Sequence, residues 1–114
     1  MAVTIYHNPR CSKSRQTLQL LRDNGVEPKI VEYLNDTPDA ATIKSILAKL
    51  GLSARDLMRR KEAVYKDLNL ASVDSDDKLV AAMVKNPILI ERPIVLANGK
   101  AALGRPPESV LDIL

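Results

Sequence analysis

The stretch AVTIYHNPRCSKSRQTLQLLRDNGVEPKIVEYL (residues 2–34) carries the strongest indication of the fold class of this chain. It opens with a short apolar run that stops at an Asn-Pro turn pair, which predicts a buried strand. A helix with a leucine stripe is expected from about Ser12 to the pair Asn24-Gly25, because glycine commonly ends helices. The apolar segment PKIVEYL (residues 28–34) predicts a second strand. A strand, a helix and a strand in this order require a parallel pair joined by a right-handed crossover.

The segment PIVLANGKAAL (residues 93–103) gives the clearest local signal in the chain. Two short apolar strands flank Asn98 and Gly99, the residue pair that a tight type I′ turn requires. This hairpin adds two antiparallel strands to the parallel pair. The economical solution is an α/β fold with a four-stranded mixed sheet flanked by helices. That is the thioredoxin-like plan, with a helical insertion between strands 2 and 3.

Further helices are expected where capping residues, prolines and glycines bound apolar patterns, namely over 37–51, from 53, over 75–85 and from 106. Thr37 supplies a capping oxygen and Pro38 suits the first helical turn, while Gly51 closes the same helix. The spacing of Ser53 and Asp56 matches a capping box, so a short helix should begin there. The first three of these helices lie between the second strand and the hairpin and form the helical insertion, and the last follows the hairpin.

Composition indicates one ordinary globular domain over residues 1–114. Apolar residues make up 46% and charged residues 27% of the sequence, which is usual for soluble proteins. No membrane span is expected, because the run PILIERPIVLA is broken by Glu91 and Arg92. We expect no secretory leader, because the residues before the first strand show no basic region, apolar stretch and cleavage site in sequence. The single cysteine excludes an internal disulfide, so we expect a cytoplasmic location.

The composition of the chain argues against nucleic acid and metal ions as partners. A net charge of +3 is too small to indicate nucleic-acid binding, and the three aromatic residues, all tyrosine, show no pattern for base stacking. One cysteine and one histidine offer no metal-ligand spacing. Cations concentrate in residues 1–22 and 55–61, and these segments would form an anion site if they converge.

The lone cysteine, Cys11, lies where the first strand gives way to the helix. Unpaired amides and the helix dipole at that position favour an anion, and Arg10, Lys13 and Arg15 add nearby cations. Such surroundings lower the pKa of a thiol and make it nucleophilic. A buried structural cysteine is the alternative interpretation, although the polar flanks would then be buried with it.

The residues that follow Cys11 argue against two known kinds of cysteine chemistry. A dithiol oxidoreductase needs Cys-x-x-Cys, but the fourth position is Ser14. A cysteine phosphatase loop needs an arginine where this chain has Thr17. A monothiol remains, and any redox cycle must take its second thiol from solution or from a partner protein.

The segments TIYHNPRCSKSR, LMRRK, NPILIERPIV and GRPPE, in this order, resemble the glutaredoxin-coupled arsenate reductases over essentially the full chain. The resemblance implies a thioredoxin-like fold and reduction of arsenate to arsenite. It also implies glutathione as co-substrate, glutaredoxin as partner protein and no bound cofactor. Two features differ from the pattern: Ser12 follows the cysteine where members tend to have glycine, and no longer tail follows Leu114.

The resemblance also implies roles for individual residues. They are the nucleophile Cys11; the oxyanion-binding Arg59, Arg92 and Arg105; the thiolate-supporting His7 and Ser14; and Pro93 as the cis-proline beside the cysteine. Guanidinium groups suit this task, because they bind tetrahedral oxyanions through paired, charge-assisted hydrogen bonds. Arg60, the next residue, would be the oxyanion ligand instead of Arg59 if the helix register in this segment differs by one residue.

Two other functions remain open for the same fold. A general glutathione-dependent thiol reductase would use the same thiol and could hold a glutathione carboxylate in the basic pocket. A redox-related regulator that binds RNA polymerase would usually switch through Cys-x-x-Cys, and Ser14 argues against that mechanism.

Overall fold

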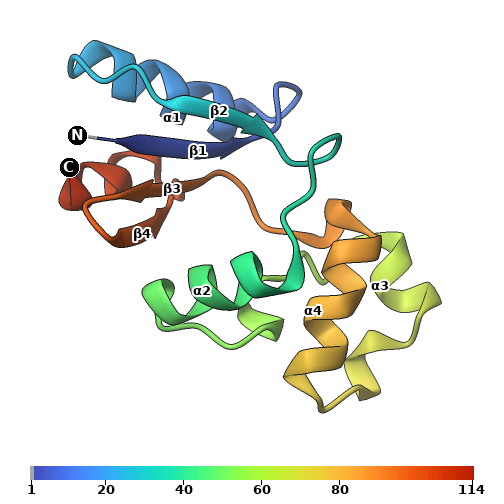
Figure 1. The fold of residues 1–114 in the computed structure, drawn as a ribbon. Coiled ribbons are helices and arrows are strands. Elements are labelled where there is room, and N and C mark those ends of the chain that lie inside the picture. Colours follow the sequence, from blue (N-terminus) through green and yellow to red (C-terminus); the bar gives the residue numbers. More distant parts are fainter. Residues whose placement is uncertain (1) are drawn as a thin grey trace. The chain divides into compact units, whose positions relative to one another are not determined.

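The computed structural model describes residues 2–114 (Figure 1). Its strands are β1 (Val3–His7), β2 (Lys29–Glu32), β3 (Ile94–Ala97) and β4 (Lys100–Leu103). Its α-helices are α1 (Ser12–Asp23), α2 (Ala40–Leu50), α3 (Ala63–Asp67) and α4 (Asp76–Lys85). Its 3-10 helices are η1 (Arg55–Leu57), η2 (Leu70–Ser72), η3 (Pro87–Leu89) and η4 (Pro107–Ile113). The chain divides into a sheet unit, formed by residues up to Asp36 together with Arg92–Leu114, and a helical unit, Thr37–Glu91.

The sheet unit confirms the predicted four-stranded mixed sheet. The strand order is β2-β1-β3-β4, with β1 parallel to β2 and both other pairs antiparallel. The β-hairpin turn is confirmed as well, since Asn98 and Gly99 both have positive φ, at 55° and 73°. The Asn98 side-chain amide also donates to the carbonyl oxygen of Ile113 at 2.8 Å, which attaches the turn to the end of η4.

Alternate residues of β1 and β3 point from one face of the sheet into a core that α1 and η4 cover (Figure 1). The buried members of this core are Val3, Ile5, Leu21, Val95, Ala97, Val110 and Ile113. Burial of each large aliphatic side chain contributes about 1.5–3 kcal/mol to folding. The period-two pattern of the strands and the leucine stripe of α1 therefore meet in one apolar layer.

The helical unit contains the insertion predicted between strands 2 and 3. Helices α2 and α4 contact each other through buried aliphatic side chains. Gly51 ends α2 in the left-handed conformation, with φ of 69°, as predicted. The helix predicted over 75–85 is α4, which begins one residue later because Ser75 is its N-cap. The predicted cap of α2 is wrong, because Asp39 rather than Thr37 is the N-cap. Its carboxylate accepts from the Thr42 amide at 2.8 Å, which leaves Pro38 outside the helix.

Two other helix predictions need correction. Ser53 forms no capping box; its hydroxyl donates to the Asp56 carboxylate at 3.0 Å, and a single 3-10 turn follows. The terminal helix η4 is a 3-10 helix rather than an α-helix. The short helices α3, η2 and η3 were not predicted, because their local patterns are too short to show a period.

Arg55 organises the short helices of the helical unit. Its guanidinium donates to the Tyr65 hydroxyl at 2.5 Å, to the Leu70 carbonyl at 3.1 Å and to the carbonyl of Val73. Arg55 was one of the cations that the sequence grouped into a possible anion site. In the structure its guanidinium instead binds carbonyl groups in and next to η2. Within residues 2–114 every helix is too short or too polar to cross a lipid bilayer.

Candidate active site

Cys11 lies at the N-cap of α1, as predicted. Its backbone is extended (φ −93°, ψ 124°), its amide donates to the Asn8 carbonyl at 3.0 Å, and its carbonyl accepts from the Arg15 amide at 3.0 Å. The first of these hydrogen bonds closes the turn between β1 and α1, and the second is the first backbone hydrogen bond of the helix. The sulfur therefore lies where the amides of the first turn have no partner within the helix. Its residue is 9% exposed, which leaves a narrow approach to the thiol.

The surroundings of Cys11 lower the pKa of its thiol. Burial acts in the opposite direction and would raise the pKa, but the Ser14 amide, the Arg92 charge, the Lys13 amide and the Arg105 charge together outweigh it. Both amides belong to the first turn of α1, and both guanidinium groups come from the far end of the sequence. The thiolate is therefore favoured by backbone donors and positive charge acting at the same atom.

The Arg105 guanidinium directly contacts the thiol. Its Nη2 lies 3.8 Å from Cys11 Sγ, within reach of an N–H···S hydrogen bond, and its Nε donates to the Arg92 carbonyl at 2.8 Å. The antiparallel pairing of β3 with β1 brings residues 92–93 to the end of β1, and the hairpin returns residues 104–105 to the same place. The peptide bond between Arg92 and Pro93 is cis, as the resemblance implied.

Gly104 allows this close approach. Its amide donates to the Pro93 carbonyl at 2.9 Å. A Cβ at this position would lie 2.4 Å from Thr17 Oγ1 and 2.7 Å from Pro93 Cγ. Only glycine leaves the segment before Arg105 enough space to lie against α1.

His7 and Ser14 form a buried pair beside the cysteine. Ser14 Oγ lies 2.6 Å from His7 Nδ1 and accepts from the Asn8 amide at 3.0 Å. Burial lowers the pKa of His7, and the charges of Arg22 and Arg15 lower it further, whereas the Glu32 charge raises it. Because the net effect is a pKa below 6.5, the ring is neutral near pH 7. The Ser14 hydroxyl thus stabilises the turn through His7 and Asn8, whereas Ser14 acts on the thiol through its backbone amide.

Arg59 belongs to the helical unit. Its amide donates to the Leu89 carbonyl at 2.7 Å, and its Nη1 forms a salt bridge with Glu62 at 2.7 Å. Arg60, its alternative, is more exposed and lies 3.4 Å from Asp56. The predicted residues of the sheet unit, Cys11, Arg92, Arg105, His7, Ser14 and Pro93, come together around one turn. The role of Arg59 remains a prediction.

The profile of the ArsC family matches residues 6–113 of this chain, which include every candidate residue described above. The chain belongs to the ArsC family.

Three proteins similar to this ArsC-family chain match it along almost their whole length. It is 62% identical over 114 residues to YfgD of Escherichia coli (strain K12), which is described as uncharacterized, with coverage of 98% of this chain and 96% of that protein. It is 49% identical over 116 residues to an arsenate reductase of Haemophilus influenzae (strain ATCC 51907 / DSM 11121 / KW20 / Rd), with both chains covered completely. A solved structure of an arsenate reductase from Vibrio cholerae is 53% identical and superposes with a TM-score of 0.97, covering 100% of this chain and 98% of that one.

Sequence reasoning missed two residues that shape the site of this ArsC-family chain. Asn8 was used only as a turn signal, although its amide binds Ser14 and its carbonyl binds the Cys11 amide. Gly104 carries no turn pattern, and only its position directly before Arg105 could have drawn notice. Within residues 2–114, no three His, Cys, Asp or Glu side chains gather as a metal ion would require.

Proposed function

We propose that this ArsC-family chain reduces arsenate to arsenite, with Cys11 as the nucleophile and with glutathione and glutaredoxin as the external thiols. The contact of the Arg105 guanidinium with Cys11 Sγ, 3.8 Å apart at the start of α1, is the observation that carries the proposal. It places a donor suited to an oxyanion beside a thiol whose pKa is lowered. The relative from Haemophilus influenzae, matched end to end and named an arsenate reductase, supports the same substrate.

Positive charge at the thiol serves both binding and chemistry. Arsenate near neutral pH is a tetrahedral anion, and guanidinium groups pair with its oxygens better than ammonium groups do. In the proposed site Arg92 and Arg105 also stabilise the charge that develops on oxygen as the thiolate attacks, when electrostatic stabilisation is most effective. Arg59 is proposed as a third oxyanion ligand on the strength of the resemblance.

The proposed cycle balances as follows. The Cys11 thiolate attacks arsenic, and one arsenate oxygen takes up two protons and leaves as water. Glutathione replaces a second oxygen in the same way, and arsenic remains pentavalent through both substitutions. A glutaredoxin thiolate then attacks the glutathione sulfur, so the electron pair of the sulfur–arsenic bond stays on arsenic, which becomes trivalent, and a mixed disulfide forms. Hydrolysis of the Cys11–arsenic bond releases arsenite and restores the thiol.

The need for external thiols also follows from the sequence. Ser14 stands where a resolving cysteine would be, and the chain has no other cysteine. We place the reaction in the cytoplasm, where glutathione keeps thiols reduced.

The experiment is arsenate-dependent NADPH consumption by the pure protein, coupled through glutaredoxin, glutathione and glutathione reductase. We expect turnover that Cys11→Ala abolishes. Arg59→Ala should raise KM for arsenate, whereas its neighbour Arg60→Ala serves as the matched control. No arsenate-dependent turnover, or turnover that survives Cys11→Ala, would refute the proposal. Faster turnover on a glutathionylated peptide than on arsenate would instead favour a general thiol reductase.

A further inference from the structure

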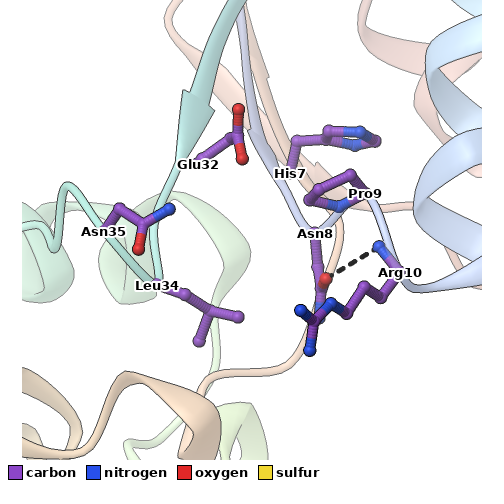
Figure 2. A pocket seen from close by; sticks show the side chains of 7 residues that line it. All are labelled: His7, Asn8, Pro9, Arg10, Glu32, Leu34 and Asn35. Carbon is purple, nitrogen blue, oxygen red and sulfur yellow. Dashed lines mark hydrogen bonds between the residues drawn. The ribbon is translucent and has the colours of Figure 1, made fainter.

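A pocket of about 330 Å³ opens beside the turn that carries Cys11, in the sheet unit (Figure 2). It lies at the carboxyl ends of the parallel strands β1 and β2, the place where open α/β sheets most often bind ligands. One wall comes from the end of β1 and the following turn, and the other from the end of β2. The lining residues are His7, Asn8, Pro9, Arg10, Glu32, Leu34 and Asn35.

The two walls carry opposite charges. Glu32 lies opposite His7 in the register of β2 and β1, and Arg10 lies on the turn across the gap (Figure 2). Among the salt bridges of residues 2–114, none includes the Glu32 carboxylate or the Arg10 guanidinium. Asn35 adds an amide on the Glu32 side. A carboxylate and a guanidinium on facing walls, with an asparagine side chain on each wall, match a ligand that carries an ammonium and a carboxylate together.

The turn itself is built firmly. The Asn8 side chain accepts from the Arg10 amide at 3.0 Å, a bond drawn as a dashed line in Figure 2. The Asn8 carbonyl accepts from the Cys11 amide at 3.0 Å. A ligand held in the pocket is therefore fixed relative to the backbone that carries the nucleophile.

We propose that this pocket binds the small thiol co-substrate through a zwitterionic α-amino acid end, as in glutathione. Glu32 pairs with the α-ammonium, Arg10 pairs with the α-carboxylate, and Pro9 and Leu34 contact the aliphatic chain. This inference rests on the proposed function, because it assigns a site to the thiol that the function requires. An inorganic oxyanion alone does not suit the pocket, since Glu32 would repel it.

The geometry lets such a ligand reach the reacting atoms. Arg10 directly precedes Cys11, so their Cα atoms are about 3.8 Å apart. In an extended tripeptide the thiol of the central residue lies two residues, about 7 Å, from the terminal α-amino acid group, and in the proposed complex this reach brings the thiol from the pocket to arsenic on Cys11. There the sulfur–arsenic bond forms, an arsenic–oxygen bond breaks, and the thiol proton leaves with that oxygen as water. No electrons are transferred in this substitution.

The test is a titration with S-methylglutathione, which cannot react, followed by NMR of the imidazole ring. His7 is the only histidine in the sequence and it lines the pocket, so one set of signals reports on binding. We expect a saturable shift. Glu32→Gln should raise the midpoint about fivefold, the loss of ~1 kcal/mol. Asn35→Ala should raise it as well.

The matched control is Glu27→Gln, since the Glu27 carboxylate pairs with Arg22 and does not line the pocket. Its midpoint should equal that of the unmodified chain. The proposal is overturned if no saturable shift is seen, if Glu32→Gln and Glu27→Gln behave alike, or if inorganic phosphate saturates the same signals at the same concentration.

Kinetics separate this inference from the function on which it rests. In the coupled assay Glu32→Gln should raise KM for glutathione and leave KM for arsenate unchanged. Turnover without S-methylglutathione binding would overturn the pocket assignment alone. Binding of S-methylglutathione without any arsenate-dependent turnover would overturn the proposed function. The pocket would then still be a site for a ligand with a zwitterionic α-amino acid end.

Discussion

Gly104→Ala would test how the chain brings Arg105 to the thiol. The added Cβ would lie 2.4 Å from Thr17 Oγ1 and 2.7 Å from Pro93 Cγ, whereas non-bonded atoms normally lie about 3.5–4.0 Å apart. Thr17 is fully buried, and its hydroxyl donates to the Lys13 carbonyl at 2.8 Å, so it cannot move away freely. Pro93 is buried too. The strain must therefore be relieved by movement of the segment that carries Arg105.

The size of the effect follows from overpacking. An extra methyl group in a well-packed region costs about 1–3 kcal/mol. For a chain of this length, a loss of ~2 kcal/mol lowers Tm by about 10 °C. Because Arg105 follows directly in sequence, its guanidinium should also move off Cys11 Sγ, and the pKa of the thiol should rise toward its usual value. Alkylation of Cys11 at neutral pH should then become slower.

Thermal unfolding followed by circular dichroism and iodoacetamide alkylation at several pH values would measure both effects. The control is a double-mutant cycle with Thr17→Ala, which removes Oγ1 and Cγ2 and leaves the Pro93 contact in place. The two substitutions should compensate each other by about 1 kcal/mol. Gly104→Ala that is as stable as the unmodified chain, or a cycle additive within about 0.5 kcal/mol, would refute the steric argument.

Three further results are expected from single substitutions. Arg105→Gln removes the guanidinium next to the Cys11 sulfur, so the pKa of the thiol should rise and alkylation at neutral pH should slow severalfold; an unchanged pH–rate profile would contradict this. Burial lowers the pKa of His7 below 6.5, so the unfolded chain takes up this proton first as the pH falls. Stability should therefore decrease below pH 6.5, and urea unfolding of His7→Gln should show a weaker decrease. Tyr65→Phe removes the oxygen that accepts from Arg55 and should lower the free energy of unfolding by about 1 kcal/mol in urea; equal stability would mean that the carbonyl contacts of Arg55 suffice.

Local backbone chemistry made part of this structure predictable. Asn98 and Gly99 adopt positive φ with little cost, so the pair predicted the hairpin turn that the structure contains. The order of strand, helix and strand likewise predicted a parallel pair, and Cys11 was expected at the helix start where it lies. Each of these signals depends on neighbours within a few residues, which is why the sequence alone was sufficient.

Where local signals competed, the sequence was ambiguous. Thr37 and Asp39 can both cap a helix, and the structure selects Asp39 because its carboxylate reaches the Thr42 amide. The sequence places Arg55 in a cluster of cations, yet in the structure its guanidinium binds the carbonyl groups of residues 70 and 73. These outcomes depend on which acceptors the folded chain places within reach, and no local pattern encodes that.

Local patterns in the sequence are enough to predict the order of the strands and the longer helices, the hairpin and the position of the one thiol at a helix start. Tertiary structure decided that Arg92 and Arg105, far along the chain, act on that thiol, and that the ends of β1 and β2 enclose a pocket of opposite charges. Both arise from strand pairing between distant segments. The physical reason is that propensities and caps act over one or two turns of backbone, whereas electrostatic fields and pockets depend on distances that only packing sets.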